Sequence, residues 1–202
     1  MGSGCTTTTA TVNGVITYAF VPTGTTDSLG NGSGQVAYTH TNTDANGNAI
    51  STITVYANRY RGIENPFGHI WKHCDDVITQ YFSGIGQRIA YKCNKPEHFA
   101  TEKNTKYKPL CAFSGGGEGY VKEIKATVNC DFFPMTKTGA SSTTYWCDYG
   151  YDNTDTSEHC LLIGGSSGSG GSAGLFGFTL HGGVGGSYVN VGSRLTYLPW
   201  AE

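Results

Sequence analysis

Histidine and aspartate side chains gather in one short stretch of the sequence, where a metal ion could be held. His69 and His73 are followed by Asp75 and Asp76, and imidazole and carboxylate groups are common ligands of catalytic zinc. The H-x-x-x-H spacing lacks the glutamate that a zinc hydrolase places between its two histidines. We therefore expect neither a metal ion nor another cofactor to be bound here.

Cysteine is the other residue type that could carry chemistry. The seven cysteines are Cys5, Cys74, Cys93, Cys111, Cys130, Cys147 and Cys160. Their wide spacing does not suit a structural zinc site, and their odd number argues against a complete disulfide framework. A nucleophilic thiol needs a base beside it, and His159 adjoins Cys160 only in sequence. We expect most of the cysteines to be buried, reduced thiols, with one or two unassigned disulfides as the alternative. We expect no catalytic residue and a protein that is not an enzyme.

A ligand-binding surface is the function that the C-terminal third of the chain favours. The aromatic segment TTYWCDYGY at residues 143–151 precedes a tract rich in glycine and serine at residues 164–195. Tyrosine loses little conformational entropy on binding, and serine and glycine adapt to many partners. The candidate ligand-binding residues are Tyr149, Tyr151, Ser166, Ser167, Ser169, Ser172, Phe178, His181 and Tyr188.

The glycine-rich tract is expected to be folded. A free linker of this composition would not retain regularly placed apolar residues such as Leu175, Leu180 and Val191. The tract also lacks the G-K-[ST] ending of a phosphate-binding loop. We therefore expect this tract to present surface positions that accept many different side chains, carried on a fixed frame.

Composition limits both the fold and the partners. Thirty glycines and only 14% charged residues suit a turn-rich, largely β protein with few, short helices. A net charge of -2 and the lack of a basic stripe argue against nucleic-acid binding. The sequence contains no apolar run of about 18 residues, so we expect no membrane insertion.

The chain divides into an N-terminal β-rich extension, residues 1–57, and a ligand-binding domain, residues 58–202. The pair Asn13-Gly14 between β-forming residues predicts a hairpin at the start. Further strands are expected at 87–93, 120–134 and 143–150, whereas residues after 68 fit either a short helical turn or a strand.

Two distant segments together resemble a known family. RGIENPFGHIW, residues 61–71, resembles the G-N-x-W-E-W element of the formylglycine-generating-enzyme-like version of the C-type lectin fold, with His69 at the usual asparagine and Lys72 at the usual glutamate. Residues 164–195 are similar to the closing segment of that family. The resemblance implies an α+β fold of the C-type lectin type, rich in strands, preceded by a hairpin-rich extension.

The resemblance also implies which residues support the frame. Trp71 is expected in the core or at its rim, and Arg194 in a buried polar network. Because the family motif brings the two segments close, we expect Glu64 to pair with Arg194.

This frame is shared by two groups of proteins. One is the variable proteins that retroelements diversify, and the other is a set of phage structural proteins. The resemblance therefore implies a non-enzymatic receptor-binding protein, either a diversified variable protein or a phage tail or fibre protein, on a virion or a bacterial cell surface. Its expected partner is a bacterial surface protein or glycan, and it is expected to form a homo-oligomer such as a trimer. The alternatives are a structural virion fibre or decoration subunit and, less favoured because no cysteine follows Cys160, a formylglycine-generating-type enzyme.

Overall fold

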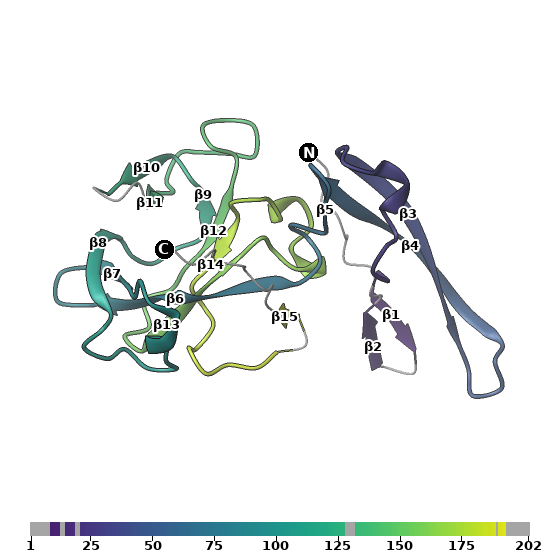
Figure 1. Cartoon of the computed structure of the whole chain (residues 1–202), viewed down its shortest axis with the longest axis horizontal. Coiled ribbons are helices and arrows are strands. Elements are labelled where there is room, and N and C mark those ends of the chain that lie inside the picture. Colours follow the sequence, from purple (N-terminus) through teal and green to yellow (C-terminus); the bar gives the residue numbers. More distant parts are fainter. Residues whose placement is uncertain (1–8, 13–14, 19–20, 128–131, 189, 193–202) are drawn as a thin grey trace, which may run out of the picture.

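The protein is built almost entirely from β-strands, as a computed structural model shows (Figure 1). The structure describes residues 9–12, 15–18, 21–127, 132–188 and 190–192. Of the described residues, 47% lie in strands and 7% in helical segments, all of which are 3-10 turns. The α+β class expected from the family resemblance is therefore wrong, and the fold is mostly β.

Local sequence explains why no α-helix forms in the described ranges. The three 3-10 segments are η1 (Asp27–Leu29), η2 (Pro96–His98) and η3 (Ser167–Ser172). Glycine and serine favour turns over helices, and η3 reads SGSGGS, with Gly170 at φ 51° inside it. Glycine accepts this left-handed conformation without strain, and it ends the regular helical path.

Fifteen strands are described, in four sheets. They are β1 (Thr9–Val12), β2 (Val15–Tyr18), β3 (Gly34–Thr43), β4 (Ala49–Tyr60), β5 (Ile63–Glu64), β6 (Trp71–Phe82), β7 (Gln87–Lys92), β8 (Lys108–Ser114), β9 (Gly119–Tyr120), β10 (Glu123–Ala126), β11 (Phe132–Thr136), β12 (Tyr149–Tyr151), β13 (Glu158–Ile163), β14 (Phe178–Thr179) and β15 (Val191–Gly192). Residues after Gly68 thus continue as a strand, β6, and not as a helical turn.

The N-terminal strands form two small sheets beside the main body (Figure 1). β1 and β2 pair antiparallel with Val12 opposite Val15, as the hairpin prediction requires, although Asn13 and Gly14 lie outside the described residues. β3, β4 and β5 form the second sheet. Alternate residues of β4 pack with Val21 to make a small core, because successive side chains of a strand point to opposite faces.

The division predicted between residues 57 and 58 falls inside β4, which continues to Tyr60. Glu64, at the end of β5, joins this sheet to the η1 turn. Its carboxylate accepts hydrogen bonds from the backbone N–H groups of Gly24 and Thr26, each at 2.8 Å, and from the Thr26 hydroxyl at 3.0 Å. The expected partner Arg194 lies outside the described residues.

The main body is an eight-stranded sheet curled into a half-barrel. Its strand order is β8-β7-β6-β13-β14-β12-β9, and β15 pairs with the start of β6. β12 runs parallel to β14 and β15 parallel to β6, whereas the other neighbours are antiparallel. β10 and β11 pair antiparallel in a sheet of their own, and β11 packs near β8, with Phe133 in the main core.

Alternation along the short central strands gives the sheet two distinct faces. Phe178 and Leu180 belong to the main apolar core, and we call their side the core face. Gly150 lies on the core face directly opposite Phe178, and a Cβ atom there would collide with the Phe178 ring. Tyr149 and Tyr151 therefore project from the other side, which we call the tyrosine face.

Candidate ligand-binding site

Three tyrosines form a contiguous row on the tyrosine face. The rings of Tyr149 and Tyr151 lie with centroids 4.6 Å apart, since a single residue separates them on β12. Tyr120 pairs with Tyr149 across β9 and β12, and their rings meet edge to face at 4.9 Å. All three side chains are half-buried, so each presents a ring edge or face to solvent while the rest of the ring is packed.

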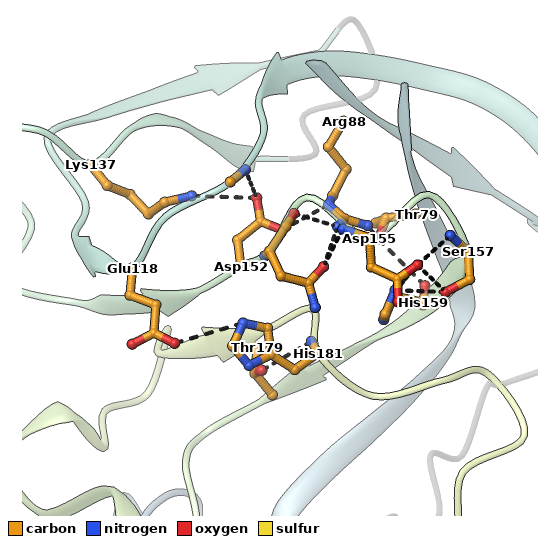
Figure 2. Close-up of polar contacts among 12 residues, drawn as sticks. Thr79, Arg88, Glu118, Lys137, Asp152, Asp155, Ser157, His159, Thr179 and His181 are labelled. Carbon is orange, nitrogen blue, oxygen red and sulfur yellow. Dashed lines mark hydrogen bonds and ion pairs between the residues drawn. The ribbon is translucent and has the colours of Figure 1, made fainter. Parts of the chain in front are cut away.

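A histidine and a glutamate extend this row. The His181 ring meets Tyr151 edge to face at 6.3 Å, and its Nε2 atom lies 3.7 Å from Oε1 of Glu118 (Figure 2). Both side chains of the pair are partly exposed. The backbone N–H of His181 donates to the Thr179 hydroxyl at 3.2 Å, which fixes the chain just after β14.

Burial raises the pKa of Tyr149, and the nearby charge of Glu118 raises it further. A tyrosine phenol is already protonated at neutral pH, so the hydroxyl of Tyr149 can donate a hydrogen bond. We name this candidate site the aromatic row; it consists of Tyr120, Tyr149, Tyr151, His181 and Glu118. It offers ring surfaces, hydroxyl donors and one carboxylate acceptor within a short span.

A buried ion cluster of Arg88, Lys137 and Asp152 lies next to the aromatic row in the chain through Asp152, and Figure 2 shows its contacts. Asp152 directly follows Tyr151, and its Oδ1 lies 2.8 Å from Nε of Arg88, with neither side chain exposed. Its Oδ2 lies 3.6 Å from Nζ of Lys137 and accepts a hydrogen bond from the backbone of Gly116 at 3.0 Å. Asp152 thus connects the end of β12 to the loop that carries Glu118.

Arg88 is held from several sides. Its Nη2 donates to the backbone carbonyl of Asn153 at 2.9 Å, and its Nη1 donates to the Thr79 hydroxyl at 3.2 Å. Burial lowers the pKa of Arg88, and the negative charge of Asp152 opposes that effect. Burial lowers the pKa of Lys137 in the same way, again opposed by Asp152. A buried arginine with several polar contacts is costly to disturb, so this cluster is a rigid support.

A serine, a histidine and an aspartate also meet near this cluster, which raises the question of catalysis. The Ser157 hydroxyl lies 2.7 Å from Oδ1 of Asp155 and 3.1 Å from Nε2 of His159. In a hydrolytic triad the carboxylate would hold the other imidazole nitrogen and the serine would give its proton to the histidine. Here the serine donates to the carboxylate instead, so this arrangement does not activate Ser157.

The thiols near this region are poor nucleophiles. Burial raises the pKa of Cys160 to about 11. Burial and then the charge of Asp76 raise the pKa of Cys74 to about 12. Thiolate is the reactive form of cysteine, so both groups are largely unreactive at neutral pH.

The structure also shows where the histidines and aspartates considered as metal ligands lie. Nδ1 of His73 lies 2.7 Å from Oδ1 of Asp75, so this histidine has a protein partner. Within the described ranges, no three histidine, cysteine, aspartate or glutamate side chains are grouped so that they could hold a metal ion. No helix in the described part of the chain is long and apolar enough to span a membrane.

The structure divides the five predicted ligand-binding residues that are not serines into three groups. Tyr149, Tyr151 and His181 come together in the aromatic row. Phe178 is buried on the core face, away from that row. Tyr188 is exposed beyond His181 in the chain, and the structure gives it no ring contact among the described residues.

The predicted serines belong mainly to the η3 turn. Ser166 is buried and caps this turn: its side chain accepts from the backbone of Gly168, and the Ser169 side chain accepts from the backbone of Ser166. Ser167 begins η3 and Ser172, half-buried, ends it. Ser166 bridges to His69, so the turn is held against the segment before β6.

Trp71, predicted as structural, is buried at the start of β6. It packs with Cys160 and Leu162 and meets the Tyr151 ring edge to face at 6.1 Å. Trp71 thus supports one end of the aromatic row from inside.

Sequence reasoning missed Glu118 and Tyr120. The segment GGGEGY at residues 115–120 signals a tight loop before a short strand. Nothing local indicates that β9 pairs with β12, because 28 residues separate the cross-strand partners Tyr120 and Tyr149.

No protein-family model, no curated protein and no solved structure matches this chain. The site is therefore interpreted from its own geometry.

Proposed function

We propose that this protein is a non-enzymatic binding protein whose aromatic row docks a glycan. The observation that carries the proposal is the contiguous row Tyr120–Tyr149–Tyr151–His181, bordered by the Glu118 carboxylate. Half-buried aromatic rings of this kind offer flat apolar surface to the C–H face of a sugar ring. The phenol hydroxyls and the carboxylate can exchange hydrogen bonds with sugar hydroxyls.

The rigid contacts beneath the aromatic row favour ligand binding over catalysis as its function. The buried Asp152 cluster and Trp71 fix the row before any ligand arrives, which lowers the entropy cost of binding. The Ser157 and Cys160 groups nearby lack an activated nucleophile. A rigid aromatic surface without such a group is what a recognition site requires.

The sequence resemblance extends this proposal to the partner and the location of the protein. It favours attachment to a bacterial surface glycan or protein, from a phage virion or a bacterial cell surface. A shallow site with few contacts binds weakly, so assembly as a trimer would increase the avidity. Sedimentation velocity of the whole chain measures that assembly directly.

The test is glycan-array screening of the whole protein against bacterial surface glycans, followed by calorimetric titration of the best ligand. We expect Tyr149→Ala to weaken binding by about tenfold or more, because tyrosine is a frequent hot spot. The matched control is Tyr56→Ala, since Tyr56 is an exposed tyrosine on β4, in a different sheet. The proposal fails if no glycan binds, or if the two variants bind alike.

A further inference from the structure

The core face of the half-barrel encloses a second site, on the side of the sheet away from the aromatic row. Here the structure forms a cavity of about 440 Å³. Its walls are almost entirely apolar, and the main lining residues are Phe113, Phe133, Leu161, Ile163, Phe178 and Leu180.

The size of this cavity indicates a ligand. Protein interiors are close-packed, and the few voids they contain are seldom larger than a water molecule. Small-molecule sites usually measure about 300–1,000 Å³, and an apolar cavity of about 150 Å³ already takes up benzene. The cavity is apolar and lies within the first range, so it fits an apolar molecule and does not suit water.

Large apolar side chains stand exposed at the rim. Trp146 is 53% exposed and Phe176 is 70% exposed, and both line the cavity together with Leu175. Exposing side chains of this size costs free energy unless a partner covers them. A molecule seated in the cavity would cover the inner sides of these rings.

The two rim segments are tied to one another at Asp148. The backbone N–H of Phe176 donates to the Asp148 carboxylate, and the backbone carbonyl of Asp148 accepts from Val121 at 2.8 Å. Tyr145 and Cys147, on either side of Trp146, have φ angles of 59° and 57°. Such a backbone is sparsely populated for these residue types, and it holds Trp146 at the rim.

Asp148 determines which polar group a ligand of this cavity must carry. The lining has two polar side chains among the described residues, Thr79 and Asp148. The Thr79 hydroxyl is already engaged, since it accepts from Arg88 and donates to the backbone carbonyl of His159. Burial raises the pKa of Asp148, opposed by the Phe176 N–H, as expected for a carboxyl group facing apolar walls.

We propose that this cavity binds a small apolar molecule whose single polar end, an amine or a hydroxyl, donates a hydrogen bond to Asp148. A fatty-acid carboxylate is disfavoured because its charge would face the Asp148 carboxylate across apolar surroundings. This site is independent of the proposed glycan site, which lies on the other face of the sheet.

The test uses the whole protein and the dye 1-aminoanthracene, whose emission increases in apolar surroundings. Dodecylamine, dodecan-1-ol and dodecanoic acid then compete for the site. We expect the amine and the alcohol to displace the dye at concentrations about tenfold lower than the acid, which corresponds to one unfavourable charge contact. In Asp148→Asn this preference over the acid should disappear.

Two variants distinguish the cavity from surface adsorption. Leu161→Trp should fill the cavity and abolish the increase in emission, while Phe176→Ala should weaken dye binding about tenfold by removing a rim contact. Phe176 is largely exposed, so its variant is expected to fold even if Leu161→Trp does not. Tyr149→Ala and Tyr56→Ala are the matched controls and should bind the dye as the parent does.

The proposal is overturned if the parent protein gives no increase in emission. It is also overturned if Phe176→Ala and a folded Leu161→Trp bind the dye like the parent, or if dodecanoic acid competes as well as dodecylamine. A loss of dye binding in Tyr149→Ala would place the dye on the tyrosine face instead. None of these outcomes bears on glycan binding, which is measured separately.

Discussion

Arg88 and Asp152 form an ion pair of 2.8 Å in which neither side chain is exposed to solvent. The pair joins β7 to the residue that follows β12, and Lys137 and Gly116 complete it. It adds a buried side-chain contact to the strand pairing of β12 with β14 and β9, which also holds the aromatic row in the sheet.

Replacing Asp152 by asparagine should therefore be strongly destabilising. Arg88 and Lys137 would be left as two buried cations without a counter-charge, a change that costs about 3–5 kcal/mol. The free energy of unfolding, from urea titration, measures the loss. Asp27→Asn is the control, since the Asp27 side chain is 77% exposed and its 3.3 Å pair with Arg59 should contribute at most about 1 kcal/mol. Equal losses in the two variants would contradict this account.

Gly150→Ala should disturb the sheet because its Cβ would collide with the Phe178 ring. We expect a loss of about 1–3 kcal/mol in the free energy of unfolding, typical of overpacking. The double variant Gly150→Ala/Phe178→Leu should recover part of this loss, which a double-mutant cycle would reveal. Gly84→Ala is the control, since a Cβ there meets no atom within 4 Å. Additive losses in the cycle would show that the two positions do not collide.

Acid should weaken the junction between β5 and the η1 turn. Burial tends to raise the pKa of Glu64, but the N–H groups of Gly24 and Thr26, the Thr26 hydroxyl and the charge of Arg59 together lower it below its ordinary value of 4.5. A carboxyl group whose pKa is lowered on folding stabilises the fold above its unfolded pKa. That stabilisation is lost as the pH falls through the folded pKa.

Urea unfolding from about pH 5 downward measures this effect, because the unfolded pKa of Glu64 lies just below that pH and the folded pKa is lower still. The parent should lose stability more steeply there than Glu64→Gln, which has no charge to lose. Parallel pH profiles for the two proteins would exclude Glu64 as a source of the pH dependence.

The glycine-rich turn should tolerate change at one position and not at another. At Gly171 a Cβ would meet no atom within 4 Å, so Gly171→Tyr should leave the melting temperature unchanged. At Gly165 the φ angle is 79°, and a Cβ would lie 2.8 Å from the Cα of Ala173, so Gly165→Ala should lower the melting temperature. Thermal melts followed by circular dichroism compare the two, and a similar decrease in both would show that the turn is uniformly intolerant.

Composition predicted the β-rich character of this protein better than family resemblance did. Glycine, threonine and tyrosine content indicated strands and turns, whereas the resemblance implied an α+β class that the described residues do not form. The resemblance rested on short motifs such as residues 61–71, and the structure shows that this segment ends β5 and begins β6. A motif of this length covers only turns and strand ends, and these do not fix the fold class.

Part of the candidate site could be predicted from the sequence, because two of its residues lie close together in the chain. Tyr149 and Tyr151 are two residues apart, and strand periodicity places such residues on one face. Tyr120, Glu118 and the Arg88–Asp152 pair could not be predicted, because strand pairing over long sequence separations brings them together. The cavity was equally unpredictable, since its walls come from β8, β11, β13 and β14 at once.

Gly150 also affects how such a protein can evolve. Its neighbours Tyr149 and Tyr151 face outward, whereas Phe178 fills the space on its inner side. If the aromatic row binds a glycan as proposed, substitution of Tyr149 can change the preferred ligand while position 150 stays glycine and Phe178 keeps its place in the core. A single residue without a side chain thus lies between the face proposed to bind a ligand and the core that must stay the same.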